Sequence, residues 1–117
     1  MNSDAKRKTR EIGIPTEIQR EAIDIIEQFN KQNLNGRSRY VPRFKGAFLY
    51  LDREDYGSLP SEISRLKYTG SLDKWEFAIF KHSSNKYDPD EFMFPGTAHL
   101  DGSIEGAMIC GMEAYPA

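Results

Sequence analysis

Cations alternate with flat side chains through the middle of the chain, from residue 37 to residue 86. On a sheet, this pattern is typical of single-stranded nucleic-acid binding, because the cations contact phosphates and the rings stack on bases. Tyrosine and tryptophan are also enriched at the centres of protein interfaces. The candidate binding residues are Arg65, Lys67, Tyr68, Trp75, Phe77, Lys81, Lys86 and Tyr87.

Catalytic chemistry has fewer candidates. Cys110 with His82 or His99 is the thiol–imidazole combination in the chain, but Cys110 lies in the apolar run 108–112, where a thiol is usually inert. The acidic stretch 88–101 with His99 is the alternative, a small enzyme site. No histidines or cysteines have the spacing of a metal site. We predict no catalytic residue, no metal and no cofactor.

Charge is divided unevenly along the chain. The net charge is −2, yet residues 1–50 carry +4 and residues 51–117 carry −6. From Asp88 onward there are six acids and no lysine or arginine. One interpretation is that the acidic part pairs with the basic first half in the fold. The other is that the separated charges matter for the binding of a partner molecule.

The composition predicts one small domain. The 117 residues are 38% hydrophobic and include 7 Phe, 6 Tyr and 1 Trp, enough for a modest core. A single cysteine excludes an intrachain disulfide framework. No apolar run approaches the roughly 18 residues of a spanning helix, which predicts a soluble, cytoplasmic protein without membrane contact. Residues 1–13 predict a disordered polar tail before a single domain, 14–117.

An amphipathic helix is predicted to begin near residue 16. Thr16 and Gln19 have the spacing of a capping box at its start, and residues 33–36 provide the turn that ends it. Its apolar face consists of Ile18, Ala22, Ile25, Ile26 and Phe29.

From residue 39 to residue 94 the apolar period changes to two, which predicts strands. Short polar turns between them indicate an antiparallel meander. Pro42, in the preceding segment 40–44, favours an edge strand or an irregular lead-in. Alternation places Ile63, Arg65 and Lys67 on one face of their strand. The predicted strands are residues 47–51, 62–68, 74–82 and 86–88.

A second helix is predicted after the N-cap cluster at residues 101–103, and Pro116 ends it. Gly106 and Gly111 weaken this helix by roughly 1 kcal/mol each, but they also permit close approach to the sheet. The predicted fold class is α+β. It has an N-terminal helix, an antiparallel meander of about four strands, and a C-terminal helix, with the helices covering mainly one face.

Two of the predicted strands, residues 47–51 and 74–82, are apolar on both sides. Phe48 and Tyr50, for example, alternate with Leu49. A sheet covered on one side shows strict apolar–polar alternation, so the second face needs cover. Either the helices divide between the faces, or the segment 92–94 covers the second face, or a partner does.

The second half of the chain also has a recurring order of short motifs. An R-[FL]-x-Y stretch at 65–68 precedes W-x-F-x-x-F at 75–80, a Lys86-Tyr87 strand and the helix after Ser103. In this order the chain resembles a family of uncharacterised small bacterial proteins, a domain of unknown function, over roughly residues 40–115. The resemblance implies the same order of elements and no activity.

These observations favour a non-enzymatic protein-binding or assembly module that uses an aromatic sheet face, with a protein partner or a second copy as a homodimer. RNA or single-stranded DNA binding on the same face is the alternative. A pI of about 5.7 and the lack of an RNP-type aromatic motif favour the first hypothesis.

Overall fold

The computed structural model describes residues 13–117, and its elements confirm the predicted α+β fold. Helix α2 (Thr16–Phe29) continues into a π-helical segment, η1 (Asn30–Leu34). The strands are β1 (Ser38–Lys45), β2 (Phe48–Asp55), β3 (Ser61–Lys67), β4 (Glu76–Lys81) and β5 (Lys86–Asp88). A short 3₁₀ helix, η2 (Thr97–His99), precedes helix α3 (Ile104–Ala114). Apart from Gly13, the predicted tail lies outside the described residues.

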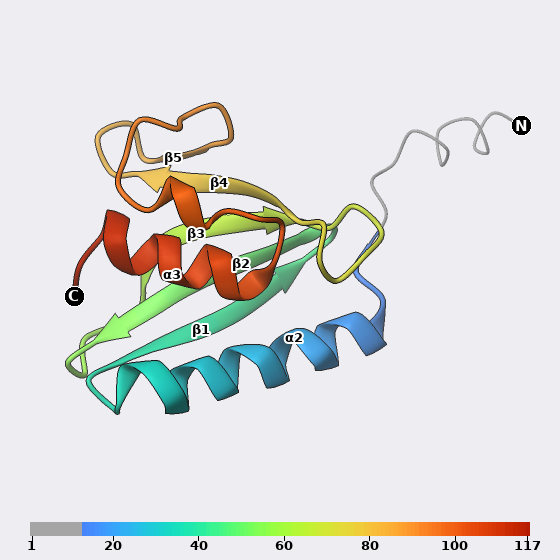
Figure 1. Cartoon of the computed structure of the whole chain (residues 1–117), viewed down its shortest axis with the longest axis horizontal. Coiled ribbons are helices and arrows are strands. Elements are labelled where there is room, and N and C mark those ends of the chain that lie inside the picture. Colours follow the sequence, from blue (N-terminus) through green and yellow to red (C-terminus); the bar gives the residue numbers. More distant parts are fainter. Residues whose placement is uncertain (1–12) are drawn as a thin grey trace, which may run out of the picture.

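The strands form one antiparallel sheet in chain order, as predicted for a meander (Figure 1). The sheet has five strands rather than about four, and the additional one is β1. It pairs with β2 along its whole length, from Ser38 opposite Asp55 to Lys45 opposite Phe48. Because proline lacks an N–H, it is tolerated at a sheet edge. The edge-strand interpretation of Pro42 is therefore confirmed.

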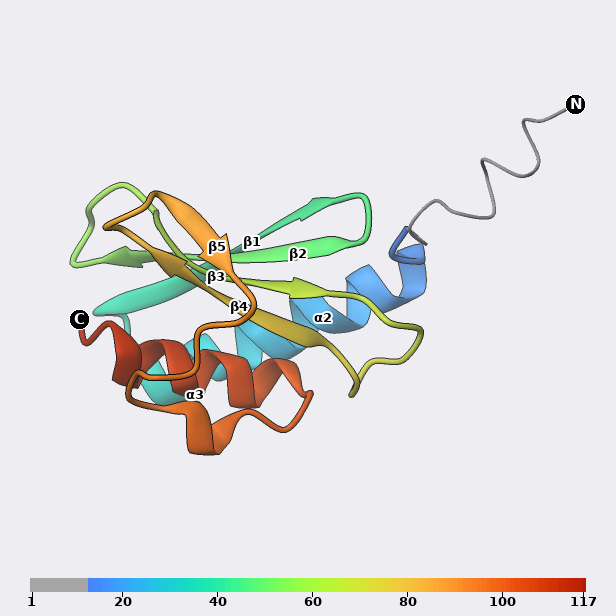
Figure 2. The same ribbon diagram turned by 90° about the horizontal axis from the view of Figure 1, so that it is seen from above.

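Both helices lie on one side of the sheet, and no helix of residues 13–117 lies on the opposite side (Figures 1 and 2). Leu49 and Leu66 of the sheet pack with Ile26 of α2 and Met108 of α3, and each is at most 1% exposed. The prediction that the helices cover mainly one face is therefore confirmed, and the alternative that they divide between the two faces is wrong. The side without helices is termed the open face.

Asn30, at the end of α2, protects the edge of the sheet. Its Nδ2 donates to the Tyr40 carbonyl at 3.0 Å, and its Oδ1 accepts from the Tyr40 N–H at 2.8 Å. The amide thus satisfies two of the backbone groups that a further strand would bind, and Pro42 presents no N–H there. An edge blocked in this way is a poor template for another chain.

The start of α2 differs from the prediction. Pro15 occupies the N-cap and no side chain caps the helix, so the capping box of Thr16 and Gln19 is wrong. Gln19 Nε2 donates instead to the Ile14 carbonyl at 2.9 Å. The Ile14 N–H donates to the Gly46 carbonyl in the β1–β2 turn at 3.3 Å. The chain before α2 is therefore fixed to the sheet through Ile14.

Helix α3 lies close to the sheet because residue 111 is glycine. A Cβ at Gly111 would collide with Tyr40 Oη and with Ile63. Tyr40 Oη donates to the Met108 carbonyl at 2.7 Å, a bond that depends on this approach. Ser103 Oγ accepts the backbone N–H three residues on at 2.9 Å, which confirms the predicted N-cap.

Arg53 of β2 is 2% exposed and binds the C-terminal end of α3. Its Nη1 donates to the Gly111 carbonyl at 3.3 Å and its Nη2 to the Tyr115 carbonyl at 2.5 Å. Nε and Nη2 also donate to the Asp55 carboxylate at 2.8 and 3.1 Å. Burial by itself would raise the pKa of Asp55, but the hydrogen bonds and charge of Arg53, together with the nearby Ser38, outweigh burial and lower that pKa. The carboxylate therefore stays charged beside the guanidinium.

Replacing Arg53 by methionine should lower the free energy of unfolding by about 3 kcal/mol, because Asp55 and the α3 carbonyls lose their donors. Urea denaturation followed by circular dichroism measures this loss. Arg39→Met is the control, since the Arg39–Glu54 pair is 3.5 Å long with 59% of the arginine side chain exposed. It should cost less than about 1 kcal/mol. Equal losses would contradict an anchoring role for Arg53.

Asn30→Ala should lower the free energy of unfolding by about 2 kcal/mol, because both backbone groups of Tyr40 lose their partner. Asn33→Ala is a matched control, since Asn33 makes one 3.3 Å bond to the Phe29 carbonyl. The same urea titration compares the variants, and an Asn33→Ala loss as large as that of Asn30→Ala would refute the edge-protecting role.

Candidate functional site

The pairing of the strands decides which side chains share the open face. Leu49 belongs to the helix-side core, so its neighbour Tyr50 points to the other side. In the register, Arg43 lies opposite Tyr50, Tyr50 opposite Arg65, and Arg65 opposite Ala78. These residues form a row across four strands. On the same face, Phe80 of β4 lies opposite Tyr87 of β5.

The open face contains Arg65, Lys67 and Tyr87 from the predicted set. Ile63 was expected to share this face with Arg65, and that expectation is wrong. The β2–β3 pairing shifts so that residue 63 has no partner in β2, and Ile63 is 2% exposed beneath α3. A β-bulge of this kind interrupts the alternation, which the sequence pattern alone does not reveal.

The predicted aromatic residues do not lie together. Tyr68 and Trp75 belong to the helix-side core at 8% and 5% exposure, with ring centroids 5.3 Å apart. Phe77 also lies on the helix side, where its ring stacks on Phe94 at 6.2 Å. The segment 92–94 therefore covers part of the helix side and not the open face.

The two remaining predicted lysines belong to the helix side as well. Lys81 Nζ lies 3.0 Å from Glu91 Oε1 and 3.8 Å from Asp88 Oδ2. Lys86 lies opposite Lys81 in the register and is exposed. Asp88 and Glu91 thus pair with a lysine of their own half. The basic first half pairs with other acids of the second half, Arg39 with Glu54 and Arg43 with Asp52.

A cluster of aromatic rings and arginines occupies the centre of the open face. The guanidinium of Arg43 lies 4.4 Å from the centroid of the Tyr50 ring. That of Arg65 lies 4.3 Å from the Phe48 centroid and 5.3 Å from the Tyr87 centroid. The Tyr50 and Tyr87 rings meet edge to face at 5.3 Å. This Tyr50 cluster consists of Arg43, Phe48, Tyr50, Arg65 and Tyr87.

Polar contacts hold the cluster in position. Arg43 Nε and Nη2 donate to the Asp52 carboxylate at 2.7 and 3.2 Å, which fixes the guanidinium over Tyr50. Tyr87 packs on Phe80, which is 3% exposed, and its Oη is buried without a hydrogen bond among the described residues. Burial, reinforced by Asp52, raises the pKa of Tyr87 to about 12. The phenol therefore stays neutral at physiological pH.

Sequence reasoning missed Arg43, Phe48 and Tyr50 as site residues. The available signal was that β2 is apolar on both sides, with Phe48 and Tyr50 alternating with Leu49. That pattern could not show which side the helices cover. The missing information is the position of α2 and α3, which is a property of the whole fold.

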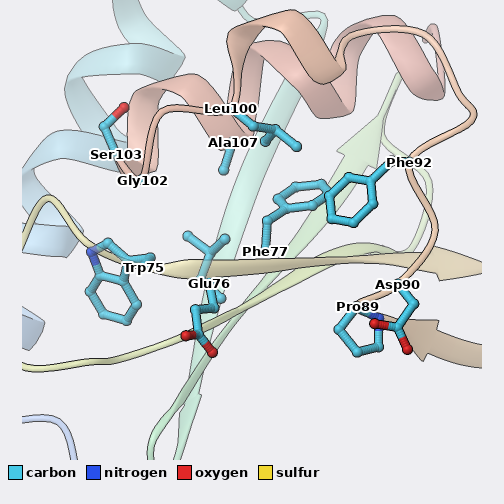
Figure 3. A pocket seen from close by; sticks show the side chains of 11 residues that line it. Trp75, Glu76, Phe77, Pro89, Asp90, Phe92, Leu100, Gly102, Ser103 and Ala107 are labelled. Carbon is cyan, nitrogen blue, oxygen red and sulfur yellow. The ribbon is translucent and has the colours of Figure 1, made fainter.

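A second feature is a pocket of about 460 Å³ between β4, the loop 89–103 and α3 (Figure 3). Phe77 and Phe92 line it together with Leu100 and Ala107 (Figure 3). The Glu76 carboxylate points away from these rings. Asp90 and Ser103 also line the pocket, so its wall combines apolar rings with polar groups.

The two histidines considered for catalysis contact other side chains, and the cysteine is buried. His99 Nε2 lies 2.8 Å from Glu113 Oε2 at the surface, and His82 packs on the rings of Phe80 and Tyr115. Cys110 is fully buried, and burial raises the pKa of its thiol to about 11. Among residues 13–117, no group of three or more His, Cys, Asp or Glu side chains could hold a metal ion.

The fold and the Tyr50 cluster define a small α+β protein with one helix-covered and one open sheet face. Comparisons with models of protein families, with curated proteins and with solved structures found no match. The resemblance to a family of small bacterial proteins therefore stays a prediction. No helix within residues 13–117 has the length and apolar character needed to cross a membrane.

The Cys110 thiol should react with Ellman's reagent more than about 100-fold more slowly in the folded protein than in urea, because it is buried and protonated. Absorbance during labelling at mildly alkaline pH measures the rate. A Cys110→Ala, Ser84→Cys variant is the control, since Ser84 is exposed. Folded protein that reacts as fast as this control would contradict the inert thiol.

Proposed function

We propose that this protein is a non-enzymatic protein-binding module and that its contact surface is the open face, centred on the Tyr50 cluster. The observation that carries the proposal is a set of half-buried aromatic rings on a helix-free sheet face, each covered by an arginine. Tyrosine and arginine are the residue types enriched at the energetic centres of protein interfaces. The rings are already ordered, so a partner orders few side chains on binding.

Single-stranded nucleic-acid binding on the same face is the second candidate, supported by Arg43 and Arg65 beside aromatic rings. Two features weigh against it. The arginines lie over the rings on which bases would stack, and Asp52 and Glu62 share the face and repel phosphates. Nucleic-acid affinity should fall steeply with salt, because each phosphate contact releases counterions.

Site-specific photo-crosslinking tests the proposal. Full-length protein carrying p-benzoyl-phenylalanine at Phe48 is irradiated in an extract of the source cells, with Ile109 of α3, 37% exposed, as the control position. We expect a discrete adduct from position 48 that protease destroys and nuclease leaves intact. It should be lost when Arg65→Glu is added, because this change removes the cation over Phe48 and Tyr87.

A nuclease-sensitive adduct, or binding of labelled single-stranded RNA that weakens with salt, would replace the proposal with the nucleic-acid candidate. The same adducts from both positions, or none from position 48, would reject the open face as a specific protein-binding surface. Circular dichroism of each variant shows that the fold is retained.

A further inference from the structure

The charged side chains of the open face are separated along the strand direction. Towards the β1–β2 turn the rows carry Arg43, Lys45, Arg65 and Lys67, with Glu76 opposite Lys67. Towards the other end they carry Asp52, Glu54 and Glu62. Asp52 is bound to Arg43 at 2.7 Å and Arg39 lies 3.5 Å from Glu54, so among residues 13–117 Glu62 is the acid of these rows without an ion pair. Of the rings in the Tyr50 cluster, Phe48 lies opposite Lys67 and Tyr50 opposite Arg65, so both belong to the basic end.

We propose that the partner of the open face is a second copy of this chain, packed face to face about a two-fold axis. This inference rests on the proposed function and names its partner. The axis lies in the interface and runs across the strands, so that the basic end of each copy faces the acidic end of the other. The charge pattern carries the inference, because it makes this face complementary to itself.

The register gives the position of the axis. Rotation about a line between the row of Tyr50 and Arg65 and the row of Asp52 and Glu62 exchanges the two rows. Arg65 of one copy then lies over Glu62 of the second copy, and the reciprocal contact forms by symmetry. An axis along the strands would instead place basic end over basic end, and like charges would repel.

Edge pairing is the other route by which sheets associate, and in this protein it is obstructed. Asn30 binds both backbone groups of Tyr40 on the free edge of β1, and Pro42 has no N–H. The opposite edge strand, β5, spans three residues. Because both edges are poor surfaces for pairing, we expect the sheet to associate through its open face.

Charge exchange between copies tests the inference. Purified full-length protein at about 50 µM, a concentration that populates a micromolar dimer, is examined by sedimentation velocity. We expect a dimer of the 13.4 kDa chain. Arg65→Glu and Glu62→Lys should each raise the dissociation constant at least about 100-fold, because each creates two like-charge contacts. Mixing the two variants should restore a dimer, since the mixed pair has opposite charges at both contacts.

Native mass spectrometry identifies the mixed dimer by mass, and Lys86→Glu is the control. Lys86 is an exposed helix-side lysine, so this variant should dimerise like the original protein. A monomeric original protein would overturn the inference, as would a mixture that stays monomeric, because loss of Arg65 would then act only within one chain. In either case a protein adduct from position 48 in the extract would leave the proposed function standing with a different partner.

Discussion

The buried guanidinium of Arg53 is the interaction on which the rest of the structure depends. A buried charge costs several kcal/mol unless its donors are used, and here Asp55 and the carbonyls of Gly111 and Tyr115 use them. Helix α3 has no basic residue to bind these carbonyls, because the chain lacks lysine and arginine from Asp88 onward. The negative end of α3 must therefore take its cation from another element, and β2 provides it.

This anchor decides where the open face lies. Along β2 the side chains alternate, so Arg53 and Leu51 point towards the helices while Tyr50 and Asp52 point away. A slip of one residue in β2 would exchange the two sets and leave the guanidinium without the α3 carbonyls. The same strand therefore holds α3 in place and provides the centre of the candidate surface. The register of β2 therefore determines both the position of α3 and the side chains on the open face.

The sequence was sufficient for features that depend on neighbouring residues. The Ser103 cap, the meander and the close approach at Gly111 follow from local patterns and are confirmed. Features that join distant residues could not be predicted from the sequence, and the contacts of Arg53 with α3 are an example. The candidate surface was predicted only in part, because Tyr68 and Trp75 have the same residue types as an exposed aromatic face yet pack beneath the helices. Residue type does not distinguish a core ring from an interface ring when both faces of a strand are apolar.

The open face shows how a one-sided sheet can carry aromatic rings without a helix above them. Arg43 and Arg65 lay their guanidinium groups on the rings of Tyr50 and Phe48, which reduces the apolar area in contact with water while the charge stays solvated. Asp52 holds Arg43 in this position with two hydrogen bonds. The arginines thus act in the free protein as the cover that the helices provide on the other side. An arginine ordered on a ring loses little further freedom when a second surface closes over it, so the groups that protect the rings also lower the entropic cost of binding.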